Sequence, residues 1–415
     1  MKRIIVNGPS RLVGEVSVSG SKNAALPIIF ATVITRGISK IRRLPNIGDV
    51  QVALEIIRGF GAVITKSGDL TYIDTRELSY RVADESLTSK IRASTYLLGA
   101  CLSRFGECRI STFGGCNFAT RPIDMHLDAC LTLGARVSDD RITVDRLKGA
   151  EINFNKQSVG ATVNAILLAV SAEGETLIHS FATEPHIDAL IDFLISAGAS
   201  IERTETEIRI EGRALHGGDI TVIGDMIEAG TYITAGLMTG GSVTVKNCPT
   251  RDMHSFFAFL TRIGANIDVN DDSVTASLSG KVEYISVIAE PYPGFPTDLQ
   301  PIVAPLMAYN AGGEITDTVW QTRFGYLEAL ASFGVDYTVR ANRAIINRSR
   351  IAPTRTVAPD LRGGAACLLC ALVAAGKSEI SAAEVILRGY ESLMEKLCAL
   401  GANIKIQEFQ KGENK

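Results

Sequence analysis

The sequence has no apolar run long enough to cross a bilayer, which takes about 20 residues. Its longest apolar stretches are residues 24–34 and 365–375. Near the amino terminus, the apolar run of residues 4–6 is far too short for the core of a signal peptide. We therefore expect neither membrane insertion nor secretion, and a cytoplasmic location.

The sequence also lacks an excess of charge of one sign. The 42 Lys and Arg residues and the 45 Asp and Glu residues leave a net charge of −3. Such a chain has no overall basic field that attracts nucleic acid or anionic lipid, so any site for an anion must be locally basic. We expect no nucleic-acid partner.

Disulfide and metal-binding patterns are missing too. The eight cysteines follow no framework spacing, and Cys101, Cys367 and Cys370 lie inside apolar helical patterns that are typical of buried, reduced thiols. Cys367 and Cys370 form a C-x-x-C pair, but no second pair or nearby His completes a zinc site. The five histidines show no ligand spacing either. We expect no disulfide and no metal.

The main feature that is present is a repeat. Six times an apolar residue, a Gly and then an Ala or Val end a predicted helix and precede a short alternating strand, the glycines being Gly61, Gly134, Gly198, Gly264, Gly334 and Gly401. Successive glycines are 73, 64, 66, 70 and 67 residues apart. A period this regular indicates duplication. We interpret each glycine as the C-cap of a helix.

Each copy has the order of an α/β unit: a helix, a Gly-led strand, a polar turn, a second helix and further strands. A chain of 415 residues exceeds what one hydrophobic core usually organises, so two domains are expected. Three units that close around buried helices would form one domain. We predict that residues 22–225 form the first domain and that residues 1–21 and 226–415 form the second. The strand expected at residues 4–7 should find its partner in the carboxy-terminal half.

Unusual polar residues collect where the first helix of each copy starts. Lys22, Arg92 and Arg362 are cations at predicted helix amino ends, where the helix dipole disfavours positive charge. Each such cation calls for a compensating anion, and the free N–H groups of helix starts also bind anions. We therefore predict a phosphate-containing ligand. The alternative, that these charges only cap helices, suits Asp225 and Glu228.

The loop of residues 114–122 contains a cysteine among glycines. Cys116 follows two glycines and precedes Arg121 by five residues. A thiol with an ordinary pKa of about 8.5 is mostly protonated at pH 7 and can donate a proton. A pKa lowered by Arg121 would instead favour a nucleophile. Both roles stay open, beside a purely structural one.

Asp298 follows a segment, residues 291–297, that contains three prolines and holds the chain rigidly before a predicted helix. With a reference pKa of about 3.9 its carboxylate is ionised at pH 7 and could accept a proton from a hydroxyl. The alternative is a carboxylate that binds the N–H groups at the start of the helix.

These residues and their neighbours resemble the enolpyruvyl transferase family, and within it the branch that acts on UDP-N-acetylglucosamine. The similarity runs along the whole chain and rests on residues 20–27, 92–94, 114–122, 158–162, 291–298, 318–319, 323–324, 360–362 and 388–391. It implies a two-domain inside-out α/β barrel, in which each domain has three repeated α/β units around buried helices. It also implies an active site in the cleft between the domains, with the Cys116 loop closing over the substrate.

The resemblance implies transfer of the enolpyruvyl group of phosphoenolpyruvate to the 3-hydroxyl of UDP-N-acetylglucosamine, with release of phosphate and without a cofactor, in peptidoglycan precursor synthesis. Lys22, Arg121 and Arg388 would hold phosphoenolpyruvate. Asp298 would take the hydroxyl proton, while Cys116 would act as the acid and could carry a covalent adduct. The residues implied to contact or support the nucleotide sugar are Asn23, Arg92, Arg121, Pro122, Lys156, Ser158, Val159, Gly160, Asp298, Val319, Arg323, Asp360, Leu361 and Arg362.

Several positions depart from the usual pattern of the family: Phe118, Ala119, His186, Met226, Gln321, Thr322, Gly363 and Gly364. They leave open a different nucleotide acceptor. Shikimate 3-phosphate is less well supported, because the Gly-Asn-Ala-Gly-Thr segment of that branch is not found. Two non-enzymatic alternatives are a ring that encircles DNA, which the charge disfavours, and an inactive paralogue that senses the nucleotide sugar, which the intact Lys22, Cys116, Asp298 and Arg388 disfavour.

Overall fold

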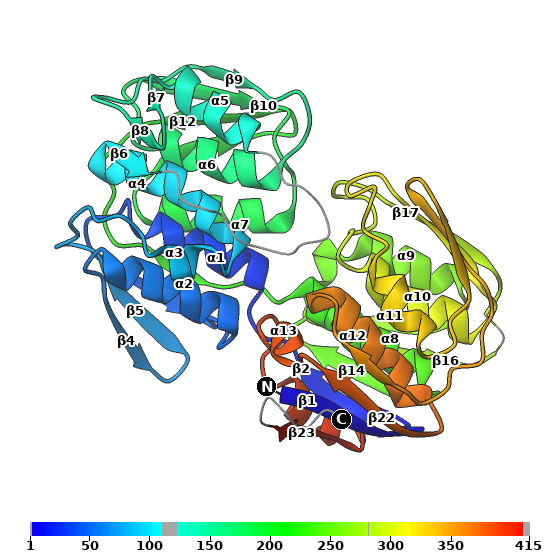
Figure 1. Cartoon of the computed structure of the whole chain (residues 1–415). Helices are drawn as coiled ribbons and strands as arrows, with labels where there is room; N and C mark the ends of the chain where they lie inside the picture. Colours follow the sequence, from blue (N-terminus) through cyan, green and yellow to red (C-terminus); the bar gives the residue numbers. More distant parts are fainter. Residues whose placement is uncertain (1, 110–122, 281, 410–415) are drawn as a thin grey trace. The chain divides into compact units, whose positions relative to one another are not determined.

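The computed structural model of the chain describes residues 2–109, 123–280 and 282–409. These residues form two compact units, each with its own helices and sheets (Figure 1). Unit 1 comprises residues 2–19, 224–280 and 282–409, and unit 2 comprises residues 20–109 and 123–223. The chain passes from one unit to the other at residues 19–20 and again at residues 223–224.

Unit 1 contains three four-stranded sheets, in the orders β21-β22-β1-β23, β15-β16-β14-β2 and β17-β18-β20-β19. Its strands are β1 (Lys2–Gly8), β2 (Val13–Ser17), β14 (Ser242–Lys246), β15 (Ala265–Val269), β16 (Ser273–Leu278), β17 (Ile285–Ala289), β18 (Gly313–Asp317), β19 (Tyr337–Arg340), β20 (Arg343–Ile346), β21 (Arg355–Val357), β22 (Gly376–Ser381) and β23 (Ile404–Glu408). In β1, Ile4 lies opposite Ile380 of β22 and Ile406 of β23. The pairing predicted for the first strand is confirmed.

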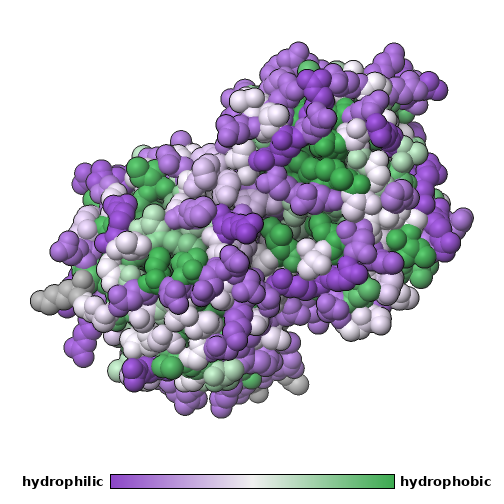
Figure 2. Space-filling view, turned by 180° about the vertical axis from the view of Figure 1, so that it is seen from behind, coloured by the Kyte–Doolittle hydropathy of each residue, from purple (hydrophilic) through white to green (hydrophobic). Residues whose placement is uncertain are grey.

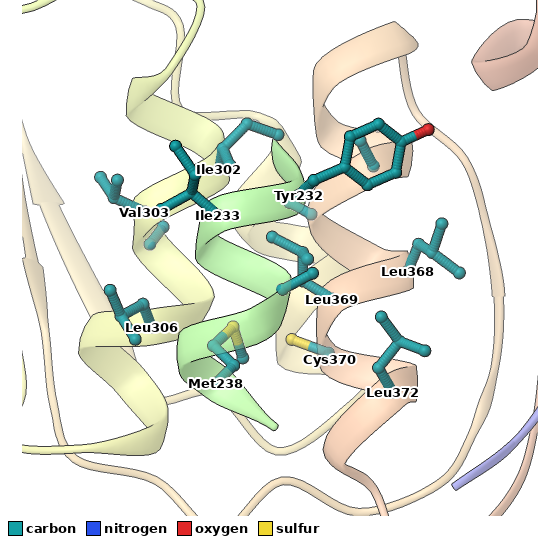
Figure 3. Close-up of a cluster of buried hydrophobic side chains, with 14 of the residues drawn as sticks. Tyr232, Ile233, Met238, Ile302, Val303, Leu306, Leu368, Leu369, Cys370 and Leu372 are labelled. Carbon is teal, nitrogen blue, oxygen red and sulfur yellow. The ribbon is translucent and has the colours of Figure 1, made fainter. Parts of the chain in front are cut away.

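Three buried helices form the middle of unit 1: α8 (Met226–Met238), α10 (Gln300–Tyr309) and α12 (Leu361–Val373). Nearly all of their residues are buried, as expected of helices that are apolar on every side. Figure 3 shows Ile233, Val303 and Leu369, one from each helix, in the shared core. The other helices are η2 (Thr250–Asp252), α9 (His254–Arg262), α11 (Tyr326–Ala331), α13 (Glu384–Leu387) and α14 (Leu393–Ala399).

Unit 2 repeats this plan, with the sheet orders β13-β3-β5-β4, β11-β12-β10-β9 and β6-β8-β7. Its strands are β3 (Ile38–Arg42), β4 (Val63–Ser67), β5 (Leu70–Asp74), β6 (Glu107–Arg109), β7 (Arg136–Ser138), β8 (Arg141–Thr143), β9 (Glu151–Asn153), β10 (Glu175–His179), β11 (Ser200–Arg203), β12 (Glu207–Glu211) and β13 (Asp219–Thr221). Its helices are α1 (Lys22–Ala31), α2 (Gly48–Gly59), α3 (Glu85–Thr88), η1 (Arg92–Tyr96), α4 (Leu97–Phe105), α5 (Asp124–Thr132), α6 (Val159–Ala169) and α7 (Pro185–Ser196).

The helices hold each unit together. Among the described strands, no hydrogen bonds join the three sheets of a unit into one closed barrel. Instead, the sheets lie around helices such as α4 and α6 in unit 2, which pack against each other in a second hydrophobic core. The expected α/β fold with buried helices is confirmed.

Two strands are exchanged between the repeats. β2 precedes α1 in the chain, yet it pairs in parallel with β14, which follows α8. Conversely, β13 precedes α8 and pairs in parallel with β3, which follows α1. In three other sheets the parallel neighbours flank a single helix, as β17 and β18 flank α10. Both exchanged strands end shortly before the chain passes to the other unit.

The six repeat glycines lie two residues beyond the last residue of the second helix of their copies, or three residues beyond it in the case of Gly334. Each has a left-handed backbone, with φ between 80° and 107°. This conformation ends a helix and strains any residue with a Cβ. The C-cap role predicted for Gly61, Gly134, Gly198, Gly264, Gly334 and Gly401 is confirmed.

The surface mixes polar and apolar residues. In the view of Figure 2, hydrophobic residues form separate patches among hydrophilic ones. A search of the described residues finds no helix that is both long and apolar enough to span a membrane.

Candidate active site

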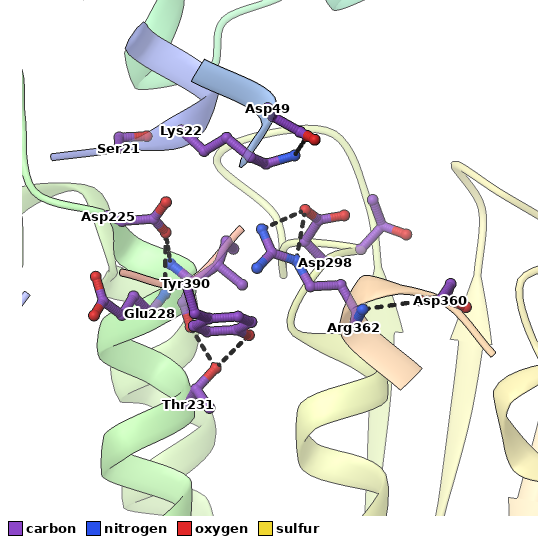
Figure 4. A network of polar contacts seen from close by, with 12 residues as sticks. Ser21, Lys22, Asp49, Asp225, Glu228, Thr231, Asp298, Asp360, Arg362 and Tyr390 are labelled. Atoms are coloured by element: carbon purple, nitrogen blue, oxygen red, sulfur yellow. Dashed lines mark hydrogen bonds and ion pairs between the residues drawn. The ribbon is translucent and has the colours of Figure 1, made fainter. Parts of the chain in front are cut away.

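Asp298 follows the proline-rich residues 291–297 in unit 1. The N-cap of α10 is the next residue, Leu299, so Asp298 does not occupy the cap position. Instead, its carboxylate accepts hydrogen bonds from two arginines. Arg323 Nη1 lies 2.6 Å from Oδ1. Arg362 Nε and Nη2 lie 3.2 and 3.1 Å from Oδ2 (Figure 4). The Asp298 side chain is 27% exposed, against 7% for Arg323 and 3% for Arg362. The carboxylate is therefore the accessible part of this charged group.

Arg323 connects the Asp298 segment to the end of β18. Its Nη1 also donates to Thr297 Oγ1 at 3.2 Å, and Thr297 in turn donates to Asp317 Oδ2 at 2.6 Å. The carbonyl of Arg323 accepts a hydrogen bond from Gln300 Nε2 at 3.1 Å. The contact with Thr297 thus fixes the Arg323 guanidinium, and the contact with Gln300 fixes the Arg323 backbone at the start of α10.

The turn after β18 is held by a single carboxylate. Asp317 Oδ1 accepts the N–H groups of Val319 and Trp320 at 2.9 and 2.7 Å. Asp317 is fully buried. Asp317 thus holds the backbone at Val319, a predicted contact of the nucleotide sugar. Asp317 itself was not among the predicted site residues.

The amino end of α12 carries three predicted site residues. Asp360 Oδ1 accepts the N–H groups of Arg362 and Gly363, both at 2.9 Å, and so caps the helix. Leu361 and Arg362 are 6% and 2% exposed. A guanidinium at a helix amino end is unfavourable in the helix dipole, and Asp298 supplies the negative charge that compensates it.

Arg388 lies at the C-cap of α13 and is half-buried. Its N–H donates to the carbonyl of Glu384 at 3.1 Å. The next residue, Gly389, approaches α12 so closely that a Cβ there would lie 2.5 Å from Leu361 Cδ2. This contact places the backbone after Arg388 against the amino end of α12.

In unit 2, Lys22 is the first residue of α1. The N-cap Ser21 accepts the N–H of Ala24 at 3.4 Å, and Asn23 is half-buried. Lys22 Nζ lies 3.4 Å from Asp49 Oδ2 in the first turn of α2, with side-chain exposures of 14% and 8%. A protein carboxylate therefore neutralises this cation too.

A buried histidine, His126, packs against Gly160 and is affected by the charge of Arg92. His126 Nδ1 lies 2.7 Å from Asn164 Nδ2, so the ring accepts a hydrogen bond and is neutral. Burial, reinforced by the charge of Arg92, lowers the pKa of His126 to about 4. A Cβ at Gly160 would lie 2.7 Å from His126 Cε1, so this ring requires a glycine at the start of α6. Burial also lowers the pKa of the half-buried Arg92 guanidinium.

The remaining predicted contacts of unit 2 lie at the start of α6. Ser158 is the N-cap, and its Oγ accepts the N–H of Ala161 at 3.4 Å. Val159 is half-buried and Lys156, in the preceding turn, is exposed. Cys116, Arg121 and Pro122 lie outside the described residues, with Phe118 and Ala119, so their roles stay predictions.

Several departures from the family pattern have a local explanation. At Gly363 a Cβ would lie 2.7 Å from Tyr326 Cβ, and at Gly364 it would lie 2.5 Å from Ile386 Cγ1. The two glycines are therefore needed for packing. His186 is buried in α7, Met226 begins α8, and Gln321 and Thr322 are exposed.

Within unit 1 the structure joins Asp298, Arg323 and Arg362 directly, and it brings Leu361 of α12 to the residue after Arg388. Thr231, Asp317 and Tyr390 were not candidates from the sequence, and the pairing of Asp49 with Lys22 was not predicted. The proximity of Tyr390 to Arg388 in the sequence was a signal for Tyr390. The only sequence signal for Thr231 was a hydroxyl-bearing residue within an apolar helical stretch.

A family model described as EPSP synthase (3-phosphoshikimate 1-carboxyvinyltransferase) matches residues 6–397. The chain belongs to this enolpyruvyl transferase family. As a family member it is an enzyme, a carboxyvinyl transferase. Its relatives include the UDP-N-acetylglucosamine 1-carboxyvinyltransferase of Chlorobium luteolum, which is 38% identical over 420 residues and 99% of both chains. Another is UDP-N-acetylglucosamine 1-carboxyvinyltransferase 2 of Clostridium acetobutylicum, 39% identical over 418 residues, 99% of this chain and 100% of the relative.

Solved structures of other enolpyruvyl transferases share the fold. The enolpyruvyl transferase NikO from Streptomyces tendae has a TM-score of 0.90 at 27% identity, over 99% of both chains. An EPSP synthase from Acinetobacter baumannii has a TM-score of 0.75 at 17% identity, over 98% of this chain and 100% of its own. Among the described residues of this enolpyruvyl transferase, no group of three or more His, Cys, Asp or Glu side chains could hold a metal ion.

Proposed function

We propose that this enolpyruvyl transferase transfers the enolpyruvyl group of phosphoenolpyruvate to the 3-hydroxyl of UDP-N-acetylglucosamine and releases phosphate. The observation that carries the proposal is the 37–39% identity, along almost the whole chain, to relatives named UDP-N-acetylglucosamine 1-carboxyvinyltransferase. The reaction would supply peptidoglycan precursors in the cytoplasm, and so serve cell-wall formation, cell shape and division.

Asp298 is the proposed base. It takes the proton of the sugar 3-hydroxyl while that oxygen attacks C2 of phosphoenolpyruvate and a proton is added to C3, which gives a tetrahedral ketal. Loss of phosphate from C2 and of a proton from C3 then restores the carbon–carbon double bond. The contacts of the carboxylate with Arg323 and Arg362 support this role, because fixed donors aim a base at one position.

Lys22, Arg121 and Arg388 are the proposed partners of the phosphate and carboxylate groups of phosphoenolpyruvate. Cations that face developing negative charge lower the barrier of the addition and elimination steps. Cys116 is the proposed acid that delivers the proton to C3, and its thiolate is the group that would carry a pyruvate-derived adduct.

Among the described residues, several of the proposed contacts of the nucleotide sugar lie at helix starts or in a capped turn. The proposed set is Asn23, Arg92, Arg121, Pro122, Lys156, Ser158, Val159, Gly160, Asp298, Val319, Arg323, Asp360, Leu361 and Arg362. Helix amino ends favour the diphosphate through their free N–H groups and dipole. The cap at Ser158 and the turn held by Asp317 support the two best-defined of these contacts.

A second candidate is an enolpyruvyl transferase that acts on another nucleotide. The chain is similar, over 99% of both chains and at a TM-score of 0.90, to NikO, an enolpyruvyl transferase whose name does not specify UDP-N-acetylglucosamine. The departures from the family pattern at His186, Met226 and Gln321 are compatible with a different acceptor. Unlike the departure at Gly363, they are not explained by tight packing.

The test is a phosphate-release assay on the purified full-length chain with phosphoenolpyruvate and one acceptor at a time. With UDP-N-acetylglucosamine we expect stoichiometric phosphate and, by mass spectrometry, a nucleotide sugar heavier by one enolpyruvyl group. Asp298→Asn should lower kcat by about 100-fold or more, since a positioned base contributes this much, and Cys116→Ser should also lower it strongly. The exposed Asp268, on β15 of the same unit, gives the matched control Asp268→Asn, which should leave kcat unchanged.

Two results would contradict the proposal. Phosphate release with another nucleotide but not with UDP-N-acetylglucosamine would favour the second candidate. Binding of UDP-N-acetylglucosamine without turnover of any acceptor would indicate a sensor of the nucleotide sugar instead of an enzyme with this substrate.

A further inference from the structure

Asn164 carries a fully buried amide in the middle of α6, a helix that is otherwise mostly apolar. Its Oδ1 accepts the N–H of Gly99, in the first turn of α4, at 2.7 Å. Its Nδ2 lies 3.1 Å from the carbonyl oxygen of Thr95 in η1 and 2.7 Å from His126 Nδ1 on α5. One side chain therefore joins α6 to three other elements of unit 2.

The partners of this amide decide its orientation. The N–H of Gly99 can only donate and the carbonyl of Thr95 can only accept, so Oδ1 faces α4 and the NH₂ group faces η1 and α5. His126 Nδ1 must then accept, which leaves the single proton of the neutral ring on Nε2. Burial and the charge of Arg92 lower the pKa of His126 to about 4 against the opposing charge of Asp124, so the ring is neutral at pH 7.

Two glycines make room for the amide and the ring. A Cβ at Gly99 would lie 2.8 Å from Asn164 Oδ1, and a Cβ at Gly160 would lie 2.7 and 3.0 Å from His126 Cε1 and Nε2. Asn164 Nδ2 also lies 3.4 Å from the carbonyl oxygen of Gly160, one turn earlier in α6. Both side chains thus pack against the first turn of α6, close to the proposed contacts at residues 158–160.

The same amide is connected to the short helix that begins at Arg92. Thr95 accepts from Asn164 with its carbonyl oxygen, and its Oγ1 donates to the carbonyl of Arg92 at 3.1 Å. A buried amide is costly unless its N–H groups and its oxygen are hydrogen-bonded, and the contacts of Asn164 meet this condition. The start of η1 and the start of α6, which both carry proposed contacts of the nucleotide sugar, are therefore linked through one side chain.

We propose that Asn164 is a positioning residue that holds the start of α6 and the start of η1 in the arrangement that binds the nucleotide sugar. Being fully buried, it acts through residues that it contacts. Toward α6 it acts on Gly160, directly and through the His126 ring, and toward η1 it acts on Arg92 through Thr95. The inference rests on the proposed role of Arg92 and residues 158–160 as contacts of the nucleotide sugar.

The test compares Asn164→Leu with the unaltered enzyme in the phosphate-release assay. Leucine fills a similar volume but loses the hydrogen bonds of the amide, so the two helix starts are no longer held together. We expect KM for UDP-N-acetylglucosamine to rise about tenfold, while kcat and KM for phosphoenolpyruvate stay within about twofold, because only binding of the nucleotide sugar is weakened. An unchanged KM for UDP-N-acetylglucosamine would overturn the inference.

Ser103→Ala is the matched control. Ser103 Oγ on α4 donates to the carbonyl of Leu167 on α6 at 2.7 Å, so this variant also removes a hydrogen bond between the two helices, nearer to their carboxyl ends. Both variants should lower the free energy of unfolding, but only Asn164→Leu should raise KM for the nucleotide sugar. An equal rise in Ser103→Ala would attribute the effect to a general loosening of the two helices and contradict the inference.

A readout without substrate uses Asn164→Asp, which keeps the volume and the oxygen that accepts from Gly99. A carboxylate cannot donate to His126, so the ring should instead donate from Nδ1. In ¹⁵N-histidine spectra at pH 7, assigned by the loss of the signal in His126→Gln, Nδ1 should be unprotonated in the unaltered enzyme and protonated in Asn164→Asp. Identical ring signals in these two proteins would show that residue 164 does not set the ring, and would overturn the inference.

Failure of the proposed function is a different result, because it appears in the unaltered enzyme as no phosphate release with UDP-N-acetylglucosamine. The comparison of Asn164→Leu with Ser103→Ala is then made with the nucleotide that the enzyme does accept or bind, by KM or Kd. A selective loss in Asn164→Leu supports the inference for that nucleotide, and equal values in the two variants overturn it.

Discussion

Arg362 donates from both Nε and Nη2 to one carboxylate oxygen of Asp298, at 3.2 and 3.1 Å. The other oxygen accepts from Arg323 at 2.6 Å. A planar guanidinium sets the direction of the carboxylate as well as its charge, which a lysine ammonium cannot do. Position 362 therefore requires a side chain that orients the Asp298 carboxylate, in addition to one that carries positive charge.

The variant Arg362→Lys tests this requirement for an orienting side chain. The variant keeps one positive charge and loses the forked donation, so we expect kcat for phosphate release to fall by roughly 10- to 100-fold while the fold is retained. Steady-state kinetics and circular dichroism measure both. Arg209→Lys is the control, since Arg209 pairs with Glu175 and Glu207 on an exposed sheet face of unit 2. Equal kcat in Arg362→Lys and the unaltered enzyme would show that charge alone is required.

His126 predicts a sensitivity to acid. Its pKa is about 4 in the folded chain, below the ordinary value of 6.5. The unfolded chain therefore binds a proton as the pH falls through 6.5, while the folded chain resists until about 4. The free energy of unfolding should decrease by up to about 3 kcal/mol over this window because of His126, and the loss should be complete below it.

His126→Gln should flatten the pH dependence of stability between pH 6.5 and 4, measured by urea unfolding at closely spaced pH values. The exposed His254 at the start of α9 provides the control His254→Gln, which should keep the slope of the unaltered chain. If both variants have the same slope, protonation of His126 does not limit acid stability.

A buried ion pair near the passage between the units makes a stability prediction. Lys396 Nζ lies 2.6 Å from Glu228 Oε1, whose side chain is 3% exposed, and Glu228 Oε2 accepts the N–H of Ser19 at 2.8 Å. Lys396→Met leaves a buried carboxylate without its cation and should lower the free energy of unfolding at pH 7 by about 3 kcal/mol or more.

The loss in free energy of unfolding caused by Lys396→Met should become smaller as the pH is lowered. Burial already raises the pKa of Glu228 and Lys396 opposes this rise, so in the variant the carboxyl takes up a proton more readily and loses its charge. Lys246→Met, which removes the cation of an exposed pair with Glu15, should cost less than about 1 kcal/mol. If Lys396→Met also lowers the free energy of unfolding by less than about 1 kcal/mol, the buried pair is dispensable for stability.

Replacing Gly363 by Ala and Gly364 by Ser should destabilise this chain. The new Cβ atoms would lie 2.7 Å from Tyr326 Cβ and 2.5 Å from Ile386 Cγ1. We expect a loss of about 2 kcal/mol from overpacking, despite a gain in helix propensity of up to about 1 kcal/mol per glycine replaced. Gly59→Ala at the end of α2, where a Cβ meets nothing within 4 Å, should be neutral or stabilising. Thermal or urea unfolding compares the two.

Several features of this protein follow from the sequence by itself, because they depend on local chemistry. The repeat period located six helix ends, since only glycine adopts the left-handed backbone there without strain. Apolar residues on every side of residues 226–238 and 361–373 indicated buried helices. The motifs with Asp298, Arg362 and Arg388 marked the family, because the segments that carry them are short and specific.

Only the tertiary structure decided which groups meet. Asp298 was expected either to act as a base or to cap a helix, and α10 has Leu299 at its cap while Asp298 contacts arginines 25 and 64 residues away. The cations Lys22 and Arg362 were expected to bind ligand anions, and Asp49 and Asp298 partly neutralise them. Such partners depend on how helices pack, and no local preference of the chain encodes a contact between Thr231 and Tyr390, 159 residues apart. The sequence determined the repeat, the family and the reactive residue types, whereas the packing of α8, α10 and α12 determined how the Asp298 carboxylate is held.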